Sequence, residues 1–558
     1  MKKTVGIFCL LLLLYTASFA QPFTHADTLR GGNGPGRSWW DATMYDLHVA
    51  FNLKDSTLSG YNIIDIKALK NGSLIQVDLQ DPMIIDSVNI TNAYQSSPGK
   101  RETAMQFPKP VKGIEKEGNA YFVSLKEELD IHHSARLFVY YHGKPVIAKK
   151  APWDGGLVWA RDKSKNPWIS IACQGLGASV WYPCKDYQGD EPDSAQIHIT
   201  APSDLVAISN GRQKSIINNN DGTSTTTWAV VNPINNYDLI PYIGRYVHFG
   251  EVYKGEKGNL SMDYWVLDSN LVKAKQQFTE APRMMKAFEY WFGPYPFYED
   301  GYKLVDAPYL GMEHQSAVAY GNGYQNGYHG MDLSGTGEGM KWDFIIVHES
   351  GHEWFGNNIT SKDIADSWIH EGFTNYSETL FTEYYFGKKA ATAYITGIRR
   401  NIENKEPVIP AYGVNKDGPI DIYYKAGNMI HTIRQVINND ETFRSILRGL
   451  NKTFYHQTVT SKQVEDFISS HSGIDFSKVF DQYLRTIQIP VLEYKIEKGG
   501  VSYRWANCVP GFNMPVKIVN EKGGLMFINP TEKTQQLKMA LTAFKADENF
   551  YINTNQIN

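Results

Sequence analysis

The chain has 558 residues, more than one hydrophobic core supports, so we expect two to four folded domains. Its composition, 42% hydrophobic and 20% charged, is that of a folded protein and excludes general disorder. The formal net charge of −4, together with the absence of Lys/Arg runs interleaved with aromatic residues, argues against nucleic acid as a partner.

The first twenty residues have the pattern of an export signal. Two lysines precede an apolar run that contains five consecutive leucines, Leu10–Leu14, and ends near Ala20. The run is shorter than the roughly 18 to 20 apolar residues that cross a bilayer, so a cleavable signal peptide over residues 1–20 is favoured over an uncleaved anchor. We therefore expect an exported protein, periplasmic or extracellular, with no stable membrane span after cleavage.

Residues 21–247 predict an N-terminal antiparallel β domain. Short segments of alternating hydrophobicity, such as the one from Tyr45 to Phe51, are separated by Asn-Gly, Pro-Gly and Asp-Gly turns. Cys173 and Cys184 fall in this region. They are either bridged across a short loop or two buried small hydrophobic residues, and the sequence leaves both alternatives open.

Residues 248–487 predict a catalytic domain in which helices dominate. Near Asn270 the hydrophobic period changes to that of a helix, and a strand at Lys303–Ala307 follows. Residues 488–558 return to short alternating segments divided by Gly-Gly turns, which indicates a small C-terminal β-sandwich. The predicted fold class is therefore α+β, with several domains.

The segment around residue 350 carries the strongest chemical signal. It reads His348-Glu349-Ser350-Gly351-His352. Histidines four positions apart lie one turn above each other on a helix, where both can bind one metal ion. Gly351 costs the helix about 1 kcal/mol relative to Ala, which indicates close packing against a neighbour. The alternative interpretation is a charged helix face without a metal.

A catalytic zinc ion takes three protein ligands and leaves a fourth position for water. Glu371 lies far enough after His352 for one helix to end and a second to present a carboxylate. His370 competes with it, but adjacent helical positions point about 100° apart, so only one can face the metal. His370 is then a surface or supporting residue. We expect one zinc ion on His348, His352 and Glu371, with Glu349 as the base that activates a water molecule.

These residues resemble the aminopeptidase N family of zinc peptidases, which also contains the leukotriene-epoxide hydrolases. The likeness extends to a Tyr-Asp-Leu opening at Tyr45, to Trp181–Asp186, to Phe292–Phe297 and to the continuation of the zinc segment as far as Asn357. It implies a thermolysin-like α/β catalytic domain and resembles secreted bacterial members of the family.

The resemblance also implies further site residues. Tyr423 matches the tyrosine of the family's Tyr-x-Lys-Gly segment and is the expected donor to the oxyanion, with Tyr424 as its competitor. Glu378 matches a carboxylate that supports the metal site from behind, the alternative being a solvated helix face.

A free amino terminus is recognised in this family by a Gly-x-Met-Glu-Asn strand. The matching stretch here is Leu310-Gly311-Met312-Glu313-His314. The resemblance implies that the backbone of Gly311 and Met312 pairs with the substrate and that Glu313 binds its ammonium group. Gln174 matches a residue that helps to hold the same amine. Leu310 and His314 depart from the family pattern, which bears on exopeptidase action more than on hydrolysis.

The leading hypothesis is therefore a zinc aminopeptidase that acts on peptides with a free amino terminus. One alternative keeps the zinc site but makes the protein an endopeptidase or an epoxide hydrolase. A second alternative is a non-catalytic member that binds peptides. The presence of all three zinc ligands and of Glu349 argues against the second alternative.

Overall fold

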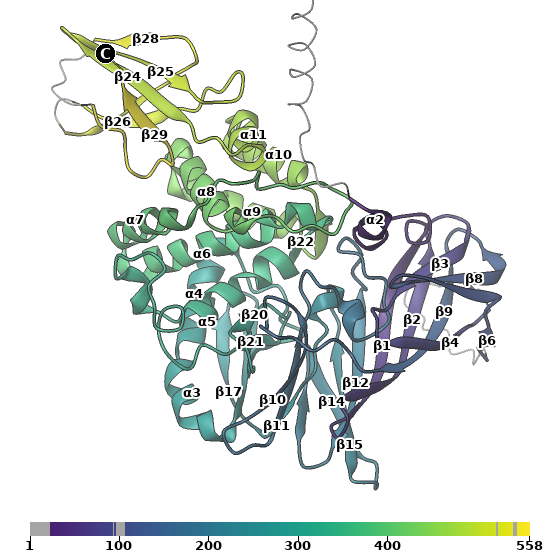
Figure 1. Cartoon of the computed structure of the whole chain (residues 1–558). Coiled ribbons are helices and arrows are strands. Elements are labelled where there is room, and N and C mark those ends of the chain that lie inside the picture. Colours follow the sequence, from purple (N-terminus) through teal and green to yellow (C-terminus); the bar gives the residue numbers. More distant parts are fainter. Residues whose placement is uncertain (1–22, 93, 96–106, 521–522, 539–543, 558) are drawn as a thin grey trace, which may run out of the picture.

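The computed structural model describes residues 23–92, 94–95, 107–520, 523–538 and 544–557. The predicted signal peptide lies outside this part. Every helix among the described residues is too short or too polar to cross a membrane. The predicted order of an N-terminal β domain, a largely helical catalytic domain and C-terminal strands is confirmed, and the three parts follow one another across Figure 1.

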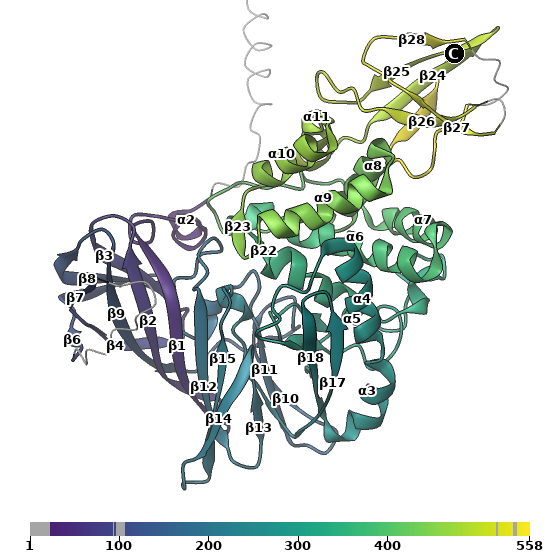
Figure 2. The same cartoon turned by 180° about the vertical axis from the view of Figure 1, so that it is seen from behind.

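The N-terminal domain is built from three sheets, which Figure 2 shows from behind. The largest has the order β14-β15-β12-β1-β2-β9-β4-β6, with β5 added beside β9. The others have the orders β10-β11-β16-β13 and β3-β8-β7. The strands are β1 (Trp40–Asn52), β2 (Thr57–Ala68), β3 (Gly72–Asp78), β4 (Ile84–Ile90), β5 (Tyr94–Gln95), β6 (Lys109–Pro110), β7 (Gly113–Glu117), β8 (Ala120–Leu129), β9 (His133–Gly143), β10 (Gly156–Arg161), β11 (Pro167–Ala172), β12 (Ser194–Pro202), β13 (Val206–Ile208), β14 (Arg212–Asn218), β15 (Thr223–Val230) and β16 (Tyr242–Gly244).

Alternating hydrophobicity explains the strands of the large sheet. In β1, Tyr45, Leu47 and Val49 are buried, whereas Asp46 and His48 between them lie on the partly exposed face. The pairs in this sheet are antiparallel as predicted, with one exception, because β1 and β12 run parallel. A short helix, α2 (His25–Gly31), and two 3₁₀ turns, η1 (Ala178–Val180) and η2 (Asn236–Asp238), complete the domain.

The catalytic domain opens with a five-stranded sheet of order β17-β18-β19-β21-β20. Its first strand begins at Tyr246, so this sheet starts slightly before the predicted boundary between residues 247 and 248. The strands are β17 (Tyr246–Gly255), β18 (Gly258–Leu267), β19 (Tyr302–Asp306), β20 (Gly311–Met312) and β21 (Val318–Tyr320), with a separate pair β22 (Ile359–Ser361) and β23 (Gln457–Val459). The helices are α3 (Leu271–Gln277), α4 (Glu280–Phe292), α5 (Phe344–Gly351), α6 (Trp368–Phe386), α7 (Lys388–Gly397), α8 (Tyr424–Ile437), α9 (Asp440–Thr453), α10 (Ser461–Ser472) and α11 (Ser477–Arg485).

The helical pattern after Asn270 forms two helices instead of one. Pro282 lies in the first turn of α4, where its missing N–H costs nothing. In a continuous helix the same proline would have to donate to the carbonyl of Phe278, which it cannot do, and its ring would clash there. The chain therefore breaks at Phe278 and Thr279 and restarts at Glu280.

The central strand β19 contributes to two hydrophobic cores. Tyr302 and Leu304 pack into the core shared with the helices, whereas Val305 belongs to the core of the N-terminal domain, as does Ala307 just beyond the strand. Since successive side chains of a strand point to opposite faces, one short strand serves both cores. The five-stranded sheet therefore lies between the two domains and contributes side chains to both of their cores.

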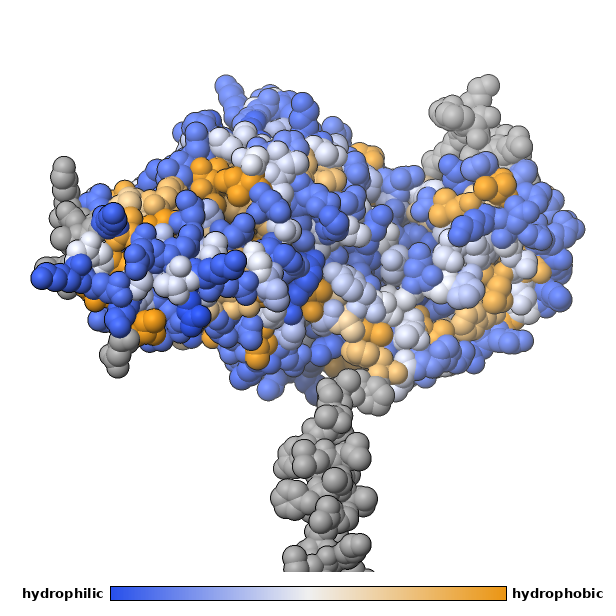
Figure 3. Space-filling model, turned by 90° about the horizontal axis from the view of Figure 1, so that it is seen from above, coloured by the Kyte–Doolittle hydropathy of each residue, from blue (hydrophilic) through white to orange (hydrophobic). Residues whose placement is uncertain are grey.

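The C-terminal strands form two small sheets, of order β28-β25-β24-β29 and β26-β27. They are β24 (Val491–Glu497), β25 (Gly500–Ala506), β26 (Val516–Val519), β27 (Leu525–Ile528), β28 (Gln535–Leu537) and β29 (Asn553–Gln556). The Oδ1 atom of Asn549 joins them to the helices through Thr392 Oγ1 and His431 Nε2, both at 3.0 Å. Seen from above, the molecular surface is mainly hydrophilic, with hydrophobic residues in small separate patches (Figure 3).

Candidate active site

Helix α5 presents the two predicted histidine ligands. It is capped by Asp343, which accepts hydrogen bonds from Ile345 N at 3.1 Å and Ile346 N at 3.3 Å. The helix ends at His352, one turn after His348, and the chain then turns back at Gly356, whose φ of 135° suits glycine. The turn allows the chain to reach the second helix of the site.

Helix α6 brings Glu371 against α5. The two helices approach closely at Gly351, where an added Cβ would lie 2.7 Å from Ser377 Oγ and 3.1 Å from Thr374 Cγ2. The packing that the glycine indicated in the sequence is therefore present. It fixes the distance between the helix that carries the histidines and the helix that carries the carboxylate.

The three predicted metal ligands converge. The distance from Glu371 Oε2 to His348 Nε2 is 3.6 Å, and the distance to His352 Nε2 is 3.3 Å. One ligand atom of each residue lies within 4.8 Å of the others, and all three side chains are buried. Two imidazole nitrogens and one carboxylate oxygen at this spacing are a donor set that suits zinc.

The outer ring nitrogens of both histidines are engaged, which orients the inner ones. His348 Nδ1 lies 2.7 Å from Glu378 Oε1, and His352 Nδ1 lies 3.1 Å from the carbonyl oxygen of Phe355. A donor role for each Nδ1 leaves both Nε2 lone pairs facing Glu371. Glu378 is buried and also accepts a hydrogen bond from Tyr394 at 2.6 Å, so it is not part of a solvated helix face.

A test of the fit to zinc comes from Glu371 itself. Its Oε2 atom is buried and has no hydrogen-bond partner among the described residues. A buried carboxylate oxygen without a partner is costly unless a cation binds it. The residues present therefore fit a zinc ion, bound by His348, His352 and Glu371.

Glu349 and Tyr423 line the same cleft as these metal ligands. Burial raises the pKa of Glu349 to about 7, the range in which a carboxylate accepts and releases protons at neutral pH. Its Oε1 lies so close to strand β20 that a Cβ on Gly311 would be 2.7 Å away. The hydroxyl of Tyr423 donates to Glu371 Oε1 at 2.9 Å, which places it beside the metal ligands.

The structure assembles the predicted amine site from both domains. Glu313, which follows strand β20, is buried, and its Oε1 accepts a hydrogen bond from Gln174 Nε2. The hydroxyl of Tyr237 donates to the same oxygen at 3.0 Å. Sequence reasoning missed Tyr237, because it is one of 34 tyrosines and belongs to no motif of the zinc segment. Asn357 Nδ2 donates to the Glu313 carbonyl at 2.7 Å and holds this chain segment against the zinc helix.

Strand β20 is the edge strand of the catalytic sheet. It pairs with β21 through Gly311 and Met312 and is the last strand in the sheet order. Leu310 and His314, which depart from the family pattern, are both buried. His314 Nδ1 forms a 2.6 Å hydrogen bond with the hydroxyl of Tyr242, so its ring supports the strand from the side of the N-terminal domain.

The structure decides between the alternatives left open for His370 and for the two cysteines, Cys173 and Cys184. His370 is buried, and its Nε2 accepts a hydrogen bond from Ser361 N at 2.8 Å. It is a supporting residue, and the surface alternative is wrong. Cys173 and Cys184 are both buried free thiols, so the alternative of a bridge between them is wrong as well.

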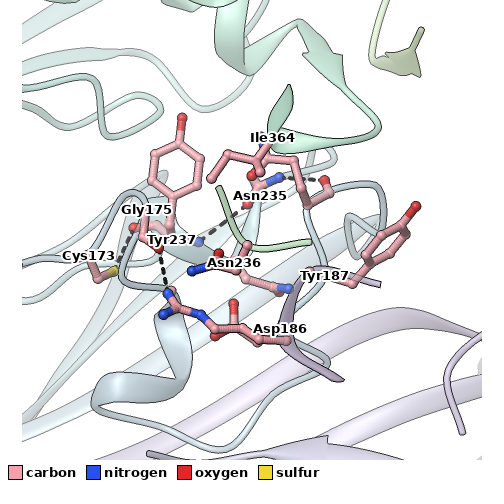
Figure 4. A pocket seen from close by; sticks show the side chains of 13 residues that line it. Cys173, Gly175, Asp186, Tyr187, Asn235, Asn236, Tyr237 and Ile364 are labelled. Carbon is pink, nitrogen blue, oxygen red and sulfur yellow. Dashed lines mark hydrogen bonds between the residues drawn. The ribbon is translucent and has the colours of Figure 1, made fainter. Parts of the chain in front are cut away.

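One cleft, with a volume of about 420 Å³, is lined by the metal ligands, by Glu349 and Tyr423, and by Glu313 and Gln174 of the amine site. A smaller cavity lies beside it where the domains meet, and Figure 4 shows Ile364 of the catalytic domain across that cavity from Asp186. Cys173 faces this smaller cavity, where its Sγ donates to the Tyr237 carbonyl at 3.4 Å.

Comparison with known proteins agrees with this arrangement. A model of the peptidase family M1 domain matches residues 277–483, and a model of the peptidase M1 N-terminal domain matches residues 41–237. The chain belongs to peptidase family M1. The resemblance to the aminopeptidase N family is thereby confirmed.

Two curated proteins illustrate how this chain compares with members of family M1. It is 22% identical to Aminopeptidase M1 of Arabidopsis thaliana over 82% of this chain and 51% of that protein. It is 19% identical to Leukotriene A-4 hydrolase of Xenopus laevis over 60% of this chain and 56% of that protein. The chain therefore spans about half the length of these curated relatives.

Among solved structures, the fold matches a mutant M1 zinc metallopeptidase from Deinococcus radiodurans bound to a Tyr-Ser-Ala substrate. The TM-score is 0.66 at 19% identity, and the match covers 80% of this M1 chain and 95% of the other. This likeness supports the fold of the M1 chain.

Proposed function

We propose that this M1 chain is a zinc aminopeptidase that removes the first residue from peptides with a free amino terminus. The observation that carries the proposal is the short distance between the two ends of the site. One ligand atom from each of Glu313, Glu349 and His352 lies within 4.8 Å of the others. A carboxylate that binds the ammonium group this close to the base leaves room for one residue between them.

Each side chain then has a distinct role. A zinc ion on the three ligands supplies a Lewis acid that polarises the peptide carbonyl and lowers the pKa of water. Glu349 takes the proton of the attacking water and passes it to the leaving amine. The hydroxyl of Tyr423 donates a hydrogen bond to the carbonyl oxygen as negative charge develops there. Glu313, with Gln174 and Tyr237, binds the substrate's ammonium group.

The backbone of the substrate can bind to the edge strand β20. The free edge of β20 (Gly311–Met312) offers backbone N–H and C=O groups to which an extended peptide can add as a further strand. This contact fixes the scissile bond relative to Glu349 without selecting a side chain. Relatives named as aminopeptidases support the same function.

The experiment is a comparison of an aminoacyl reporter that has a free amine with its N-acetylated counterpart, with and without a chelator. We expect hydrolysis of the free-amine reporter only, and loss of that activity with the chelator. Preference for the blocked reporter would instead indicate an endopeptidase.

The Glu349→Gln variant tests the proposed base. It should lose turnover and keep its zinc, because the three proposed ligands, His348, His352 and Glu371, are unchanged. Metal content measured on the same sample as activity separates the two effects, and retained turnover would rule out the proposed base.

We propose further that residues 1–20 direct export and are removed. The basis is the sequence pattern of two lysines followed by an apolar run. Amino-terminal sequencing of the protein recovered from the periplasm or medium of an expressing bacterium would test this. A mature chain that begins at Met1 would contradict it.

A further inference from the structure

A second group of side chains of the types that can bind a metal ion lies on the partly exposed face of strand β1 in the N-terminal domain. Groups of this kind occur three times in the described part of the chain; two share His352, and the third is Asp46, His48 and His198. Strands β1 and β12, which carry the third group, run side by side in Figure 1, and their parallel register places His48 directly opposite His198. Asp46 lies two residues before His48 and so on the same face.

The distances in this cluster match those at the catalytic centre. Asp46 Oδ1 lies 3.3 Å from His48 Nε2 and 2.9 Å from His198 Nε2. At the catalytic centre, the carboxylate oxygen lies 3.6 and 3.3 Å from two Nε2 atoms. The donor set is the same in both places, with two imidazole nitrogens around one carboxylate oxygen. In this second cluster the donors come from two strands instead of two helices.

The surroundings also support metal binding. His198 Nδ1 forms a 2.9 Å hydrogen bond with Thr227 Oγ1, and a donor role for that Nδ1 leaves Nε2 as a ligand.

The ring orientation sets one requirement. The rings of His48 and His198 are stacked, with centroids 4.0 Å apart and an angle of 6° between their planes. Nearly parallel rings do not aim their Nε2 lone pairs at one point, so both must turn about their side-chain bonds to bind one ion. The ring of His48 is also stacked on Tyr61, with centroids 4.3 Å apart, so His48 must leave this contact when it turns. The side chains of the two histidines are 30% and 20% exposed, so solvent reaches the cluster and a water molecule can serve as a fourth ligand.

We propose that Asp46, His48 and His198 form a second metal site, for a divalent ion of the zinc, copper or nickel class that imidazole ligands favour. An ion bound there would connect β1 to β12, two strands far apart in the sequence. The site is separate from the catalytic centre, so the proposal is independent of the proposed peptidase activity.

The test is the metal content of the chain at equilibrium with dilute Zn²⁺. The wild-type protein should bind two ions, and the His48→Gln and His198→Asn variants should bind one. The His142→Gln variant is the matched control, because His142 lies on the same sheet and contacts Asp86 Oδ1 at 2.7 Å in a pair that has only one imidazole. It should keep two ions.

Copper gives a second measurement. With zinc in the catalytic site and Cu²⁺ added, the electron paramagnetic resonance spectrum should show coupling to two nitrogens in the wild type. It should show coupling to one nitrogen in either single variant. The ion retained at the catalytic centre demonstrates that a variant has folded. A single ion in the wild type, or two ions in both histidine variants, would overturn the proposal.

Discussion

Tyr237 gives the amine site a contact from the N-terminal domain. Its hydroxyl donates to Glu313 Oε1 at 3.0 Å, and the same oxygen accepts from Gln174. Burial raises the pKa of Glu313, and the hydrogen bond from Tyr237 opposes that rise. The two donors also fix the position of the carboxylate, so an ammonium group that binds it loses little orientational freedom there.

The Tyr237→Phe variant should therefore lose selectivity for free amines. Removing a hydrogen bond to a charged group costs about 1.5 to 3 kcal/mol, which corresponds to about a 10- to 100-fold fall in kcat/KM. Steady-state kinetics on a free-amine reporter measures the loss. Tyr246→Phe is the control, because the Tyr246 hydroxyl donates to the Asp306 carbonyl and touches no residue of the amine site. Equal losses in both variants would contradict the assigned contact.

At the scale of elements, strand β20 and helix α5 approach each other at one glycine. A methyl group on Gly311 would lie 2.7 Å from Glu349 Oε1 and 2.9 Å from Ile345 Cγ2. Real side chains do not come so close, so either the strand or the base must move. The Glu349 carboxylate can therefore occupy this position beside the strand because residue 311 has no side chain.

We expect Gly311→Ala to reduce kcat while zinc content stays unchanged. A displacement of about 1 Å at the base is enough for a loss of up to about 100-fold. Parallel measurements of turnover and bound zinc test this. Gly113→Ala is a suitable control, because nothing lies within 4 Å of the added methyl. Wild-type turnover in Gly311→Ala would show that the close approach has no catalytic role.

The sequence predicted the elements that are marked by motifs or spacings of nearby residues in the chain. The spacing of His348 and His352 marked the zinc helix, and the structure brings both to Glu371. The break at Phe278 and Thr279 was missed because apolar periodicity continues across it. The pairing of His48 with His198 was also beyond the sequence, because strand register between distant segments depends on the whole sheet.

At the scale of the whole molecule, Lys303 lies between the two large domains. It is buried on β19, its Nζ donates to the Gly211 carbonyl, and it lies 5.4 Å from the ring centre of Trp228. Burial lowers the pKa of this lysine to about 7. Because Lys303 has a different pKa in the folded and unfolded chain, it makes the protein's free energy of unfolding depend on pH.

The direction follows from proton binding. Between about pH 7 and 10, unfolded chains bind a proton at Lys303 that the folded chain does not, so the free energy of unfolding rises with pH in this window. The contribution is at most about 1.4 kcal/mol per pH unit. Compared with the wild type, Lys303→Met should show a smaller rise in thermal stability between pH 7 and 9, as measured by calorimetry. Parallel pH profiles for the two proteins would contradict the lowered pKa.

The position of the five-stranded sheet between the two domains has a consequence for how this protein could be regulated. The zinc ligands all belong to the catalytic domain, whereas Gln174 and Tyr237 belong to the N-terminal domain and contact Glu313 from there. On the proposed function, a small hinge opening between the domains would leave the metal ligands, Glu349 and Glu313 in place and would remove the two donors that orient Glu313. Affinity for a free amino terminus would then depend on contact between the domains, whereas the metal site and the base belong to one domain.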